Sequence, residues 1–203
     1  MWRNDDAHHR GEMETKSEIV TQYVSDMHVL EKHIQEALEK QVGQTKDQPD
    51  VNAGIVKYVA ITKTHVERLE QRLAQLGNQD GVIDKVKEGV TNLAGQAAGV
   101  IDAVRTHQDS KNLRDDYTAA SLASISYVML QTTALACGDQ QTADLAKAQL
   151  GETVQMLQWI ARTIPAATVR DLEAERKVDL NTGAIAQVSR DPQLAALYGS
   201  ATA

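Results

Sequence analysis

The sequence predicts an all-α fold: an antiparallel four-helix bundle with a long crossover that contains an extra helix, followed by a C-terminal extension. Apolar residues recur at steps of three and four in several separate segments, which is the spacing of one face of an α-helix. Phe is absent and aromatic residues make up only 3% of the chain, so aliphatic side chains and Met must fill the core. That composition favours helices packed on helices over a β-sandwich.

The first two predicted helices form a hairpin. One helix spans 14–42 and ends near Gly43, and a second ends at the stop signal formed by Gly77 and Asn78. The polar link between them is short and contains Pro49, so we expect the two helices to lie antiparallel. The ladder positions are Val20, Val24, Met27, Glu31, Ile34 and Leu38 in the first helix and Val59, Thr62, Val66, Leu69, Leu73 and Leu76 in the second.

Three further helices are predicted along the rest of the chain. A ladder over 83–104 predicts a crossover helix, and the Ala- and Ser-rich segment 112–137 predicts a helix that ends at Gly138. The last helix of the bundle is predicted over 140–163, where Pro165 breaks it. Two hairpins separated by a long crossover are one of the standard layouts of a four-helix bundle. The ladder of the last helix consists of Ala143, Leu150, Val154, Leu157 and Ile160.

The crossover segment has one alternative interpretation. Lysines flank its apolar stripe, as they do in helices that lie on a membrane surface. However, the stripe contains no Trp or Phe anchor, and Asp84, Glu88 and Asp102 would be repelled by anionic lipid. A helix that covers the bundle is therefore the favoured interpretation.

The chain is expected to form one domain with loose ends. We expect a flexible N-terminal tail over 1–13, the helical bundle over 14–163, and a C-terminal extension over 164–203. Turn signals interrupt the extension, which should pack on the bundle or on a second subunit.

Charge and cysteine content narrow the class of protein. The formal net charge is -7 and there is no basic cluster to follow a phosphate backbone, which argues against a nucleic-acid partner. Cys137 is the single cysteine and cannot form an internal disulfide. No apolar run approaches the roughly 18 residues of a membrane span, and the N-terminus lacks a signal-peptide pattern. We therefore expect a soluble cytoplasmic protein with no membrane span.

Three polar side chains lie on or beside the predicted inner faces: Glu31, His65 and Glu152. Carboxylates and imidazoles that point inward in an all-helical protein are typical of metal ligands, because an unpaired buried charge is too costly. Each also has a structural interpretation. Glu31 would be a buried carboxylate bonded to Tyr58, Tyr127 or His65, His65 a satisfied core histidine, and Glu152 a residue of the helix surface.

Several segments resemble a known family. The run DMHVLEKHIQEAL at 26–38 is similar to the first-helix pattern of the YciE/YciF-type ferritin-like stress proteins. The run HVERLE at 65–70, followed by a Leu-Gly pair at 76–77, is similar to the second-helix pattern. Residues 127–160 can be laid along the last two helices of the family. The resemblance covers 15–163, and HVERLE is its most specific piece.

The resemblance implies a ferritin-like bundle with a di-metal carboxylate site between its two hairpins. Such a site takes a carboxylate from each of two helices and a Glu-x-x-His pair from each of the other two. Glu31 stands at the first-helix carboxylate, His65 at the second-helix imidazole, and Glu152 at a fifth-helix carboxylate. The positions that depart from the pattern are Ala60, Ile61, Thr62, Ala120, Ala123 and Gln155.

Two functions follow as hypotheses. The favoured one is a degenerate ferritin-like bundle, a non-enzymatic stress-response or structural protein with an incomplete di-metal site and no cofactor. The alternative is an oxidase or peroxide-detoxifying protein with one iron or manganese ion held by Glu31, His65 and Glu152. Under both hypotheses a homodimer is expected, because small residues line the faces of the third and fourth predicted helices.

Overall fold

The computed structural model describes residues 15–77, 108–176 and 179–194, and within these ranges the regular secondary structure is entirely helical. The all-α prediction is therefore confirmed for the described part of the chain. The predicted tail over 1–13 and the predicted crossover helix over 83–104 lie outside it. The described helices are α1 (Lys16–Val42), α2 (Pro49–Gln75), α5 (Asp109–Cys137), α6 (Gln140–Arg176) and α7 (Gly183–Ser189).

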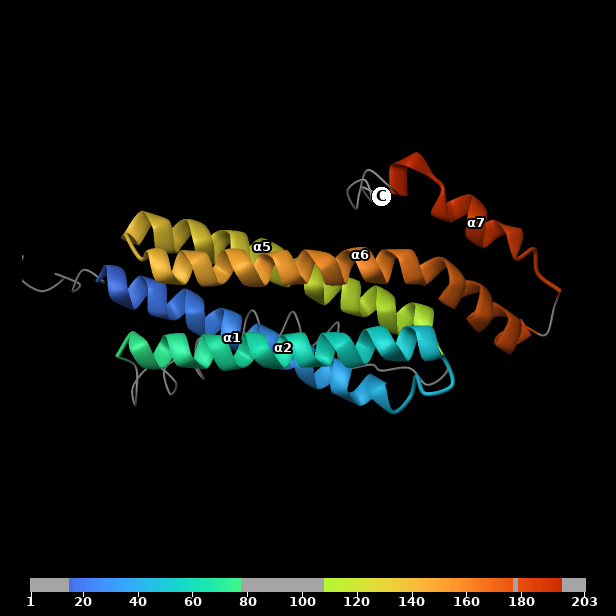
Figure 1. Ribbon diagram of the computed structural model, residues 1–203, viewed down its shortest axis with the longest axis horizontal. Helices are drawn as coiled ribbons and strands as arrows, with labels where there is room; N and C mark the ends of the chain where they lie inside the picture. Colours follow the sequence, from blue (N-terminus) through green and yellow to red (C-terminus); the bar gives the residue numbers. More distant parts are fainter. Residues whose placement is uncertain (1–14, 78–107, 177–178, 195–203) are drawn as a thin grey trace, which may run out of the picture.

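The four long helices form two hairpins that pack against each other (Figure 1). The first pairs α1 with α2, and the second pairs α5 with α6. Across the bundle, α1 lies antiparallel to α5, because Gln41 near the end of α1 bonds to Asp116 near the start of α5. As a result α2 and α5 run in the same direction, and Gly77 and Gln108 stand at opposite ends of the bundle.

A cluster of polar contacts joins the end of α2 to the start of α6. The guanidinium Nη2 of Arg72 lies 2.6 Å from Oδ2 of Asp139, and its Nε donates to the hydroxyl of Thr142 at 2.7 Å. Asp139 also accepts from the backbone N–H of Thr142, which caps the first turn of α6. Burial would raise the pKa of Asp139, but bonds from Thr142 and Arg72 lower it. The antiparallel alignment of α2 and α6 is fixed at this end of the bundle.

The ends of α1 and α5 lie close to their predicted positions. Thr15 and Glu18 form a capping box at the start of α1, with each side chain bonded to the backbone N–H of the other. Gly138 follows the end of α5 with φ of 83°, a left-handed conformation that favours glycine. The predicted bounds 14–42 and 112–137 are confirmed to within three residues.

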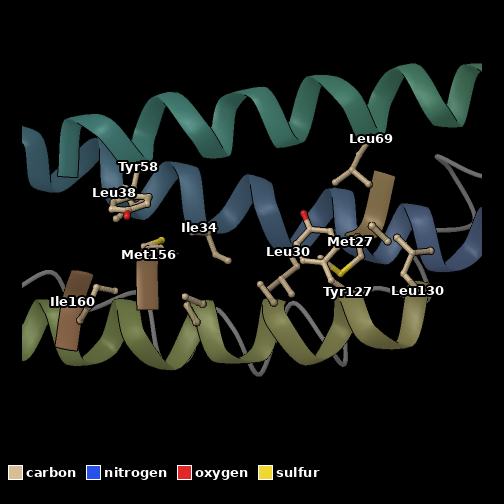
Figure 2. Close-up of a cluster of buried hydrophobic side chains, with 14 of the residues drawn as sticks. Met27, Leu30, Ile34, Leu38, Tyr58, Leu69, Tyr127, Leu130, Met156 and Ile160 are labelled. Atoms are coloured by element: carbon tan, nitrogen blue, oxygen red, sulfur yellow. The ribbon is translucent and has the colours of Figure 1, made fainter. Parts of the chain in front are cut away.

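Aliphatic residues and two tyrosines form the core between the hairpins (Figure 2). The predicted ladder of α1 is buried at every position, including Glu31. Tyr58 and Tyr127 are among the largest fully buried side chains. Each large apolar side chain removed from water in this way stabilises the fold by about 1.5–3 kcal/mol.

The inner face of α6 differs from the predicted one. Val154 is 38% exposed, and Leu150 and Leu157 are only half-buried at the edge of the core. The helix instead turns polar residues inward, because Gln149 donates a hydrogen bond to the backbone carbonyl of His65 across the bundle. Of the predicted ladder, Ala143 and Ile160 are buried as expected. The buried residues of α6 are Thr142, Ala143, Ala146, Gln149, Thr153, Met156, Ile160, Ala161 and Ala167.

The prediction that Pro165 breaks the last helix was wrong. α6 continues through Pro165 to Arg176, beyond the boundary drawn at 163. A proline inside a helix costs about 3 kcal/mol, and contacts beyond it offset that cost. Asp171 accepts hydrogen bonds from the backbone N–H and the hydroxyl of Ser110, at 2.8 and 2.6 Å. Arg170 pairs with Asp50 at 3.0 Å, and α7 packs against α6 further along.

Candidate polar site in the bundle core

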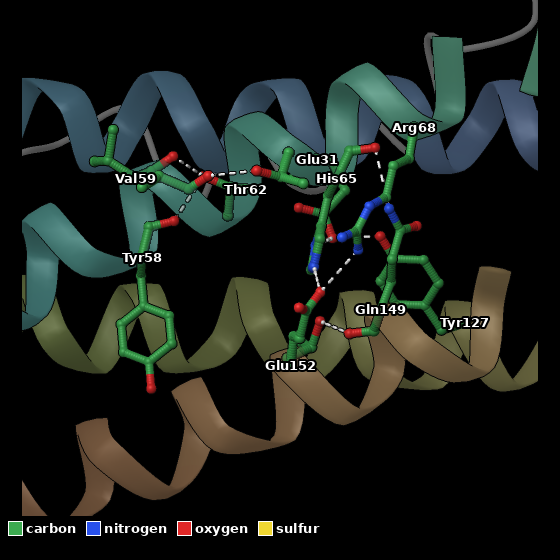
Figure 3. Close-up of polar contacts among 12 residues, drawn as sticks. Glu31, Tyr58, Val59, Thr62, His65, Arg68, Tyr127, Gln149 and Glu152 are labelled. Atoms are coloured by element: carbon green, nitrogen blue, oxygen red, sulfur yellow. Dashed lines mark hydrogen bonds and ion pairs between the residues drawn. The ribbon is translucent and has the colours of Figure 1, made fainter. Parts of the chain in front are cut away.

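A polar site lies in the middle of the bundle and takes one side chain from each long helix (Figure 3). Glu31 comes from α1, His65 from α2, Tyr127 from α5 and Glu152 from α6. The first three are at most 1% exposed, whereas the side chain of Glu152 is 36% exposed. The structure therefore brings together all three residues that the sequence predicted as a site.

The imidazole of His65 lies between the two carboxylates. Its Nδ1 is 3.1 Å from Oε1 of Glu31, and its Nε2 is 2.8 Å from Oε2 of Glu152. Tyr127 donates its hydroxyl hydrogen to the same Oε1 of Glu31 at 2.6 Å. One ring thus links α1, α2 and α6, and the Tyr127 hydroxyl adds α5.

Both carboxylates favour the charged form of the imidazole. Burial by itself would lower the pKa of His65, but the hydrogen bonds and charges of Glu31 and Glu152 raise it above its ordinary value of 6.5. Only the protonated ring can donate from both nitrogens at once. When protonated, His65 would bridge the two carboxylates as an imidazolium.

Two neighbours complete the charge balance. Arg68 places Nη1 3.4 Å from Oε2 of Glu152 at the exposed edge of the site. Burial and the adjacent Glu31 raise the pKa of Tyr127 well above 10, so its hydroxyl stays a neutral donor. With His65 protonated, the site contains two negative and two positive groups, and its formal charges cancel.

A small cavity borders Glu31, His65 and Glu152. It offers about 10 Å³, room for roughly one water molecule, and Glu31, Thr62, Ala120 and Ala123 are among the residues that line it. The second carboxylate oxygen of Glu31, Oε2, is buried and has no hydrogen-bond partner among the described residues. The hydroxyl of Thr62 does not donate to this oxygen, because it donates to backbone carbonyls of α2.

The arrangement does not fit a two-metal centre. Ala120 and Ala123 line the cavity where two more carboxylates would be required. The two ring nitrogens of His65 point to opposite sides of the imidazole, so the ring separates Glu31 from Glu152. One ion cannot contact both carboxylates and a ring nitrogen unless these side chains move. Within the described ranges no group of three or more His, Cys, Asp or Glu side chains is placed to hold an ion.

Two contributors were not predicted as site residues. Gln149 is fully buried and holds the backbone of His65, and Arg68 neutralises Glu152. Gln149 could have been found from spacing, since it belongs to the inward positions 142, 146, 149, 153, 156 and 160, which step by four and three. Gln155, one of the positions that depart from the family pattern, is exposed.

The sequence was compared with known protein families and solved structures. The family described as "Domain of unknown function (DUF892)" matches residues 15–173. The chain belongs to this family. The DUF892 match covers all four long helices up to the turn of α6 that contains Asp171. It therefore includes every residue of the polar site as well as the segment beyond Pro165. No solved structure matches the chain at a significant level.

Proposed function

We propose that this DUF892 chain is a non-enzymatic ferritin-like bundle, a structural or interaction protein in which protonated His65 takes the place of a metal cation. The observation that carries the proposal is the bridge itself. Both ring nitrogens of His65 are bonded to carboxylates, and these carboxylates come from two different helices.

The order of the helices supports the ferritin-like part of the proposal. Each of the two hairpins is antiparallel, and α2 and α5 run in the same direction, so the chain needs one long connection between them. A bundle with a single long crossover is the ferritin-like arrangement. The polar site also lies between the two hairpins, where that class of bundle places its metal ions.

The net charge of the buried groups favours an imidazolium over metal ions at this site. A buried carboxylate is stable only if a positive charge or several hydrogen bonds compensate it. One imidazolium and one guanidinium match the two carboxylates of Glu31 and Glu152. Two divalent ions would instead leave a large excess of positive charge in a core that has lost the other ligands.

Metal binding separates this proposal from the alternative of an iron or manganese protein. Purified protein would be mixed anaerobically with Fe(II) or Mn(II), desalted, and assayed for metal per chain by mass spectrometry. We expect less than about 0.1 ion per chain, no metal-induced rise in Tm, and Fe(II) oxidation no faster than in buffer. The controls are Glu31→Ala and a form that lacks residues 1–13, because His8 and His9 in that tail could bind metal adventitiously.

The alternative has one observation in its favour, the unbonded Oε2 of Glu31 beside the cavity. If one ion per chain is retained, is lost in Glu31→Ala and persists without residues 1–13, the imidazolium proposal is wrong. The chain would then be a mononuclear iron or manganese protein in which a side-chain movement frees a nitrogen of His65 for the ion.

A further inference from the structure

Three residues that line the cavity beside Glu31 offer hydrogen-bond acceptors and no free donor. Oε2 of Glu31 itself is buried and has no partner among the described residues. Thr62 and Thr153 line the same cavity and are both buried. Thr62 donates its hydroxyl hydrogen to carbonyls of α2 (Figure 3), and Thr153 donates its own to the carbonyl of Gln149 at 2.9 Å. Each threonine oxygen keeps lone pairs that can accept a further hydrogen bond.

The donors of the polar site are used on other atoms. The hydroxyl of Tyr127 donates to Oε1 of Glu31, not to Oε2. Both ring nitrogens of His65 lie within hydrogen-bond distance of carboxylate oxygens, and neither of these oxygens is Oε2 of Glu31. A buried carboxylate oxygen that no donor reaches is costly, because it has lost the water that solvated it.

We propose that this cavity binds one water molecule, which donates one hydrogen to Oε2 of Glu31 and the other to the hydroxyl oxygen of Thr62 or Thr153. Because the three residues supply acceptors, the bound molecule must bring at least two donor hydrogens. That requirement excludes dioxygen, and it excludes chloride and other anions, which Glu31 would also repel. The volume of about 10 Å³ has room for about one water molecule and for no larger donor.

Charge distinguishes water from ammonium, a cation of similar size that also donates to every neighbour. With His65 protonated, the charges of Glu31, Glu152, His65 and Arg68 cancel, so a neutral molecule completes the site. This choice of water over ammonium rests on the proposed function. If His65 were neutral, the carboxylates would need another cation, and ammonium would fit the same acceptors.

The water molecule would join three helices at one point. Glu31 belongs to α1, Thr62 to α2 and Thr153 to α6. Up to three polar partners is within the range of about two to four that buried water molecules normally have. The space itself exists because Ala120 and Ala123 of α5 have short side chains on this side of the cavity.

A crystal structure at about 1.2 Å resolution, from protein treated with EDTA, tests the proposal. We expect one peak about 2.6–3.0 Å from Oε2 of Glu31 and within hydrogen-bond distance of a threonine hydroxyl. The peak should have no anomalous signal at the iron or manganese edge. In solution, ¹⁷O magnetic relaxation dispersion should count one long-lived water molecule fewer in Ala123→Ser, because the serine hydroxyl takes its place and donates to Glu31.

The matched variants are Ala123→Val and the same two substitutions at Ala134, which is 0% exposed on α5 and does not line the cavity. Valine fills the cavity but brings no donor. Serine should therefore be tolerated better than valine at position 123, by a margin in Tm of at least about 5 °C. At position 134 serine should have no such advantage, and an equal margin at both positions would overturn the proposal.

The other contrary outcomes are distinct. An empty cavity would overturn this proposal and leave the proposed function intact. A peak with an anomalous signal would overturn both, because a metal ion would then compensate Glu31. A rise in Tm of more than about 2 °C when about 100 mM ammonium chloride replaces sodium chloride would identify ammonium as the ligand, and would also show that His65 is neutral.

Discussion

Trp159 of α6 lies directly over Gly54 of α2, where the Cβ of any other residue at position 54 would overlap its indole ring. The same ring meets Tyr58 one turn further along α2, with centroids 5.3 Å apart. α2 and α6 can approach this closely because position 54 has no side chain. A glycine inside a helix thus sets the spacing between the two hairpins.

Replacing a helical glycine by alanine usually stabilises a protein, but at position 54 we expect the replacement to destabilise it. Gly54→Ala gains about 1 kcal/mol of helix propensity but forces Trp159 to move, and we expect a net loss of about 1–3 kcal/mol. Gly151→Ala is the matched control, because Gly151 lies on α6 with open space at its Cβ position. It should stabilise the fold by up to about 1 kcal/mol. Urea unfolding followed by circular dichroism measures both, and equal effects of the two variants would contradict the packing described.

The charge on His65 should make the fold less stable at alkaline pH. The folded pKa of His65 lies above 6.5, so its protonated form stabilises the protein fully below pH 6.5, and this contribution is lost as the pH rises through the folded pKa. NMR titration of the His65 ring should report the raised pKa directly. In Glu152→Gln, which removes one of the two bridged charges, the pKa should fall toward 6.5.

A suitable control for that titration is Glu67→Gln. Glu67 is exposed on the same helix and two positions from His65. It should leave the His65 pKa within about 0.3 units of the wild-type value, since an exposed charge is strongly screened. A wild-type pKa at or below 6.5 would show that the ring is neutral and that the bridge is not ionic.

Asp116 should oppose folding at neutral pH. Burial raises the pKa of this carboxyl to about 7, against 3.8 in the unfolded chain. The hydrogen bond from Gln41 lowers the pKa, but by less than burial raises it. Between these values the folded state holds the extra proton, so stability should fall as pH rises from about 4 to 7, by roughly 4 kcal/mol at most. Asp116→Asn keeps the acceptor for Gln41 and should abolish this fall.

The comparison is best made at pH 5 and pH 8 by urea unfolding. Asp116→Asn should be more stable than wild type at both values, by the full amount at pH 8 and by only about a third as much at pH 5. Glu36→Gln serves as the control, because Glu36 is exposed on α1 and should not change the slope. If the stability of the His65→Gln variant, which lacks the His65 contribution, stays level from pH 5 to pH 8, Asp116 is ionised in the fold.

Asp171 should hold the start of α5 in place although it belongs to α6. No side chain of its own segment caps α5, and Asp171 accepts from the backbone N–H of Ser110 instead. We expect Asp171→Ala to cost about 1–2 kcal/mol, the typical worth of a helix cap. Amide exchange over 110–113 should accelerate, whereas Glu173→Ala, an exposed neighbour, should have no such effect. Unchanged exchange in Asp171→Ala would mean that α5 needs no cap.

The first hairpin could be predicted because its pattern is regular. Each ladder position of α1 is inward, and the one polar exception, Glu31, was correctly placed on the inner face. For α6 the same reasoning failed, since Gln149 and Thr153 are inside while Val154 is outside. From hydropathy alone, Val154 would be placed inside and the two polar residues outside, which is the opposite of what the structure shows. Pro165 was misjudged because the contacts of Asp171 that offset its cost come from residues distant in sequence.

The site could be predicted in its membership but not in its chemistry. Glu31, His65 and Glu152 stand out as polar residues at or beside inner positions. Which of them touch depends on how each helix is rotated about its axis, and a one-dimensional pattern does not contain that rotation. The position of the ring between the two carboxylates, rather than beside them, is therefore known only from the structure.

The bridge described for His65 changes what the folded state requires from its surroundings. A bundle whose central cation is an ion from solution can fold fully only when that ion is available. If His65 replaces the ion, as proposed, the cation is part of the polypeptide, and the only thing it must take up is a proton. Such a protein would keep its shape through iron starvation or iron excess, and acidification would strengthen its centre where a bound ion would be released.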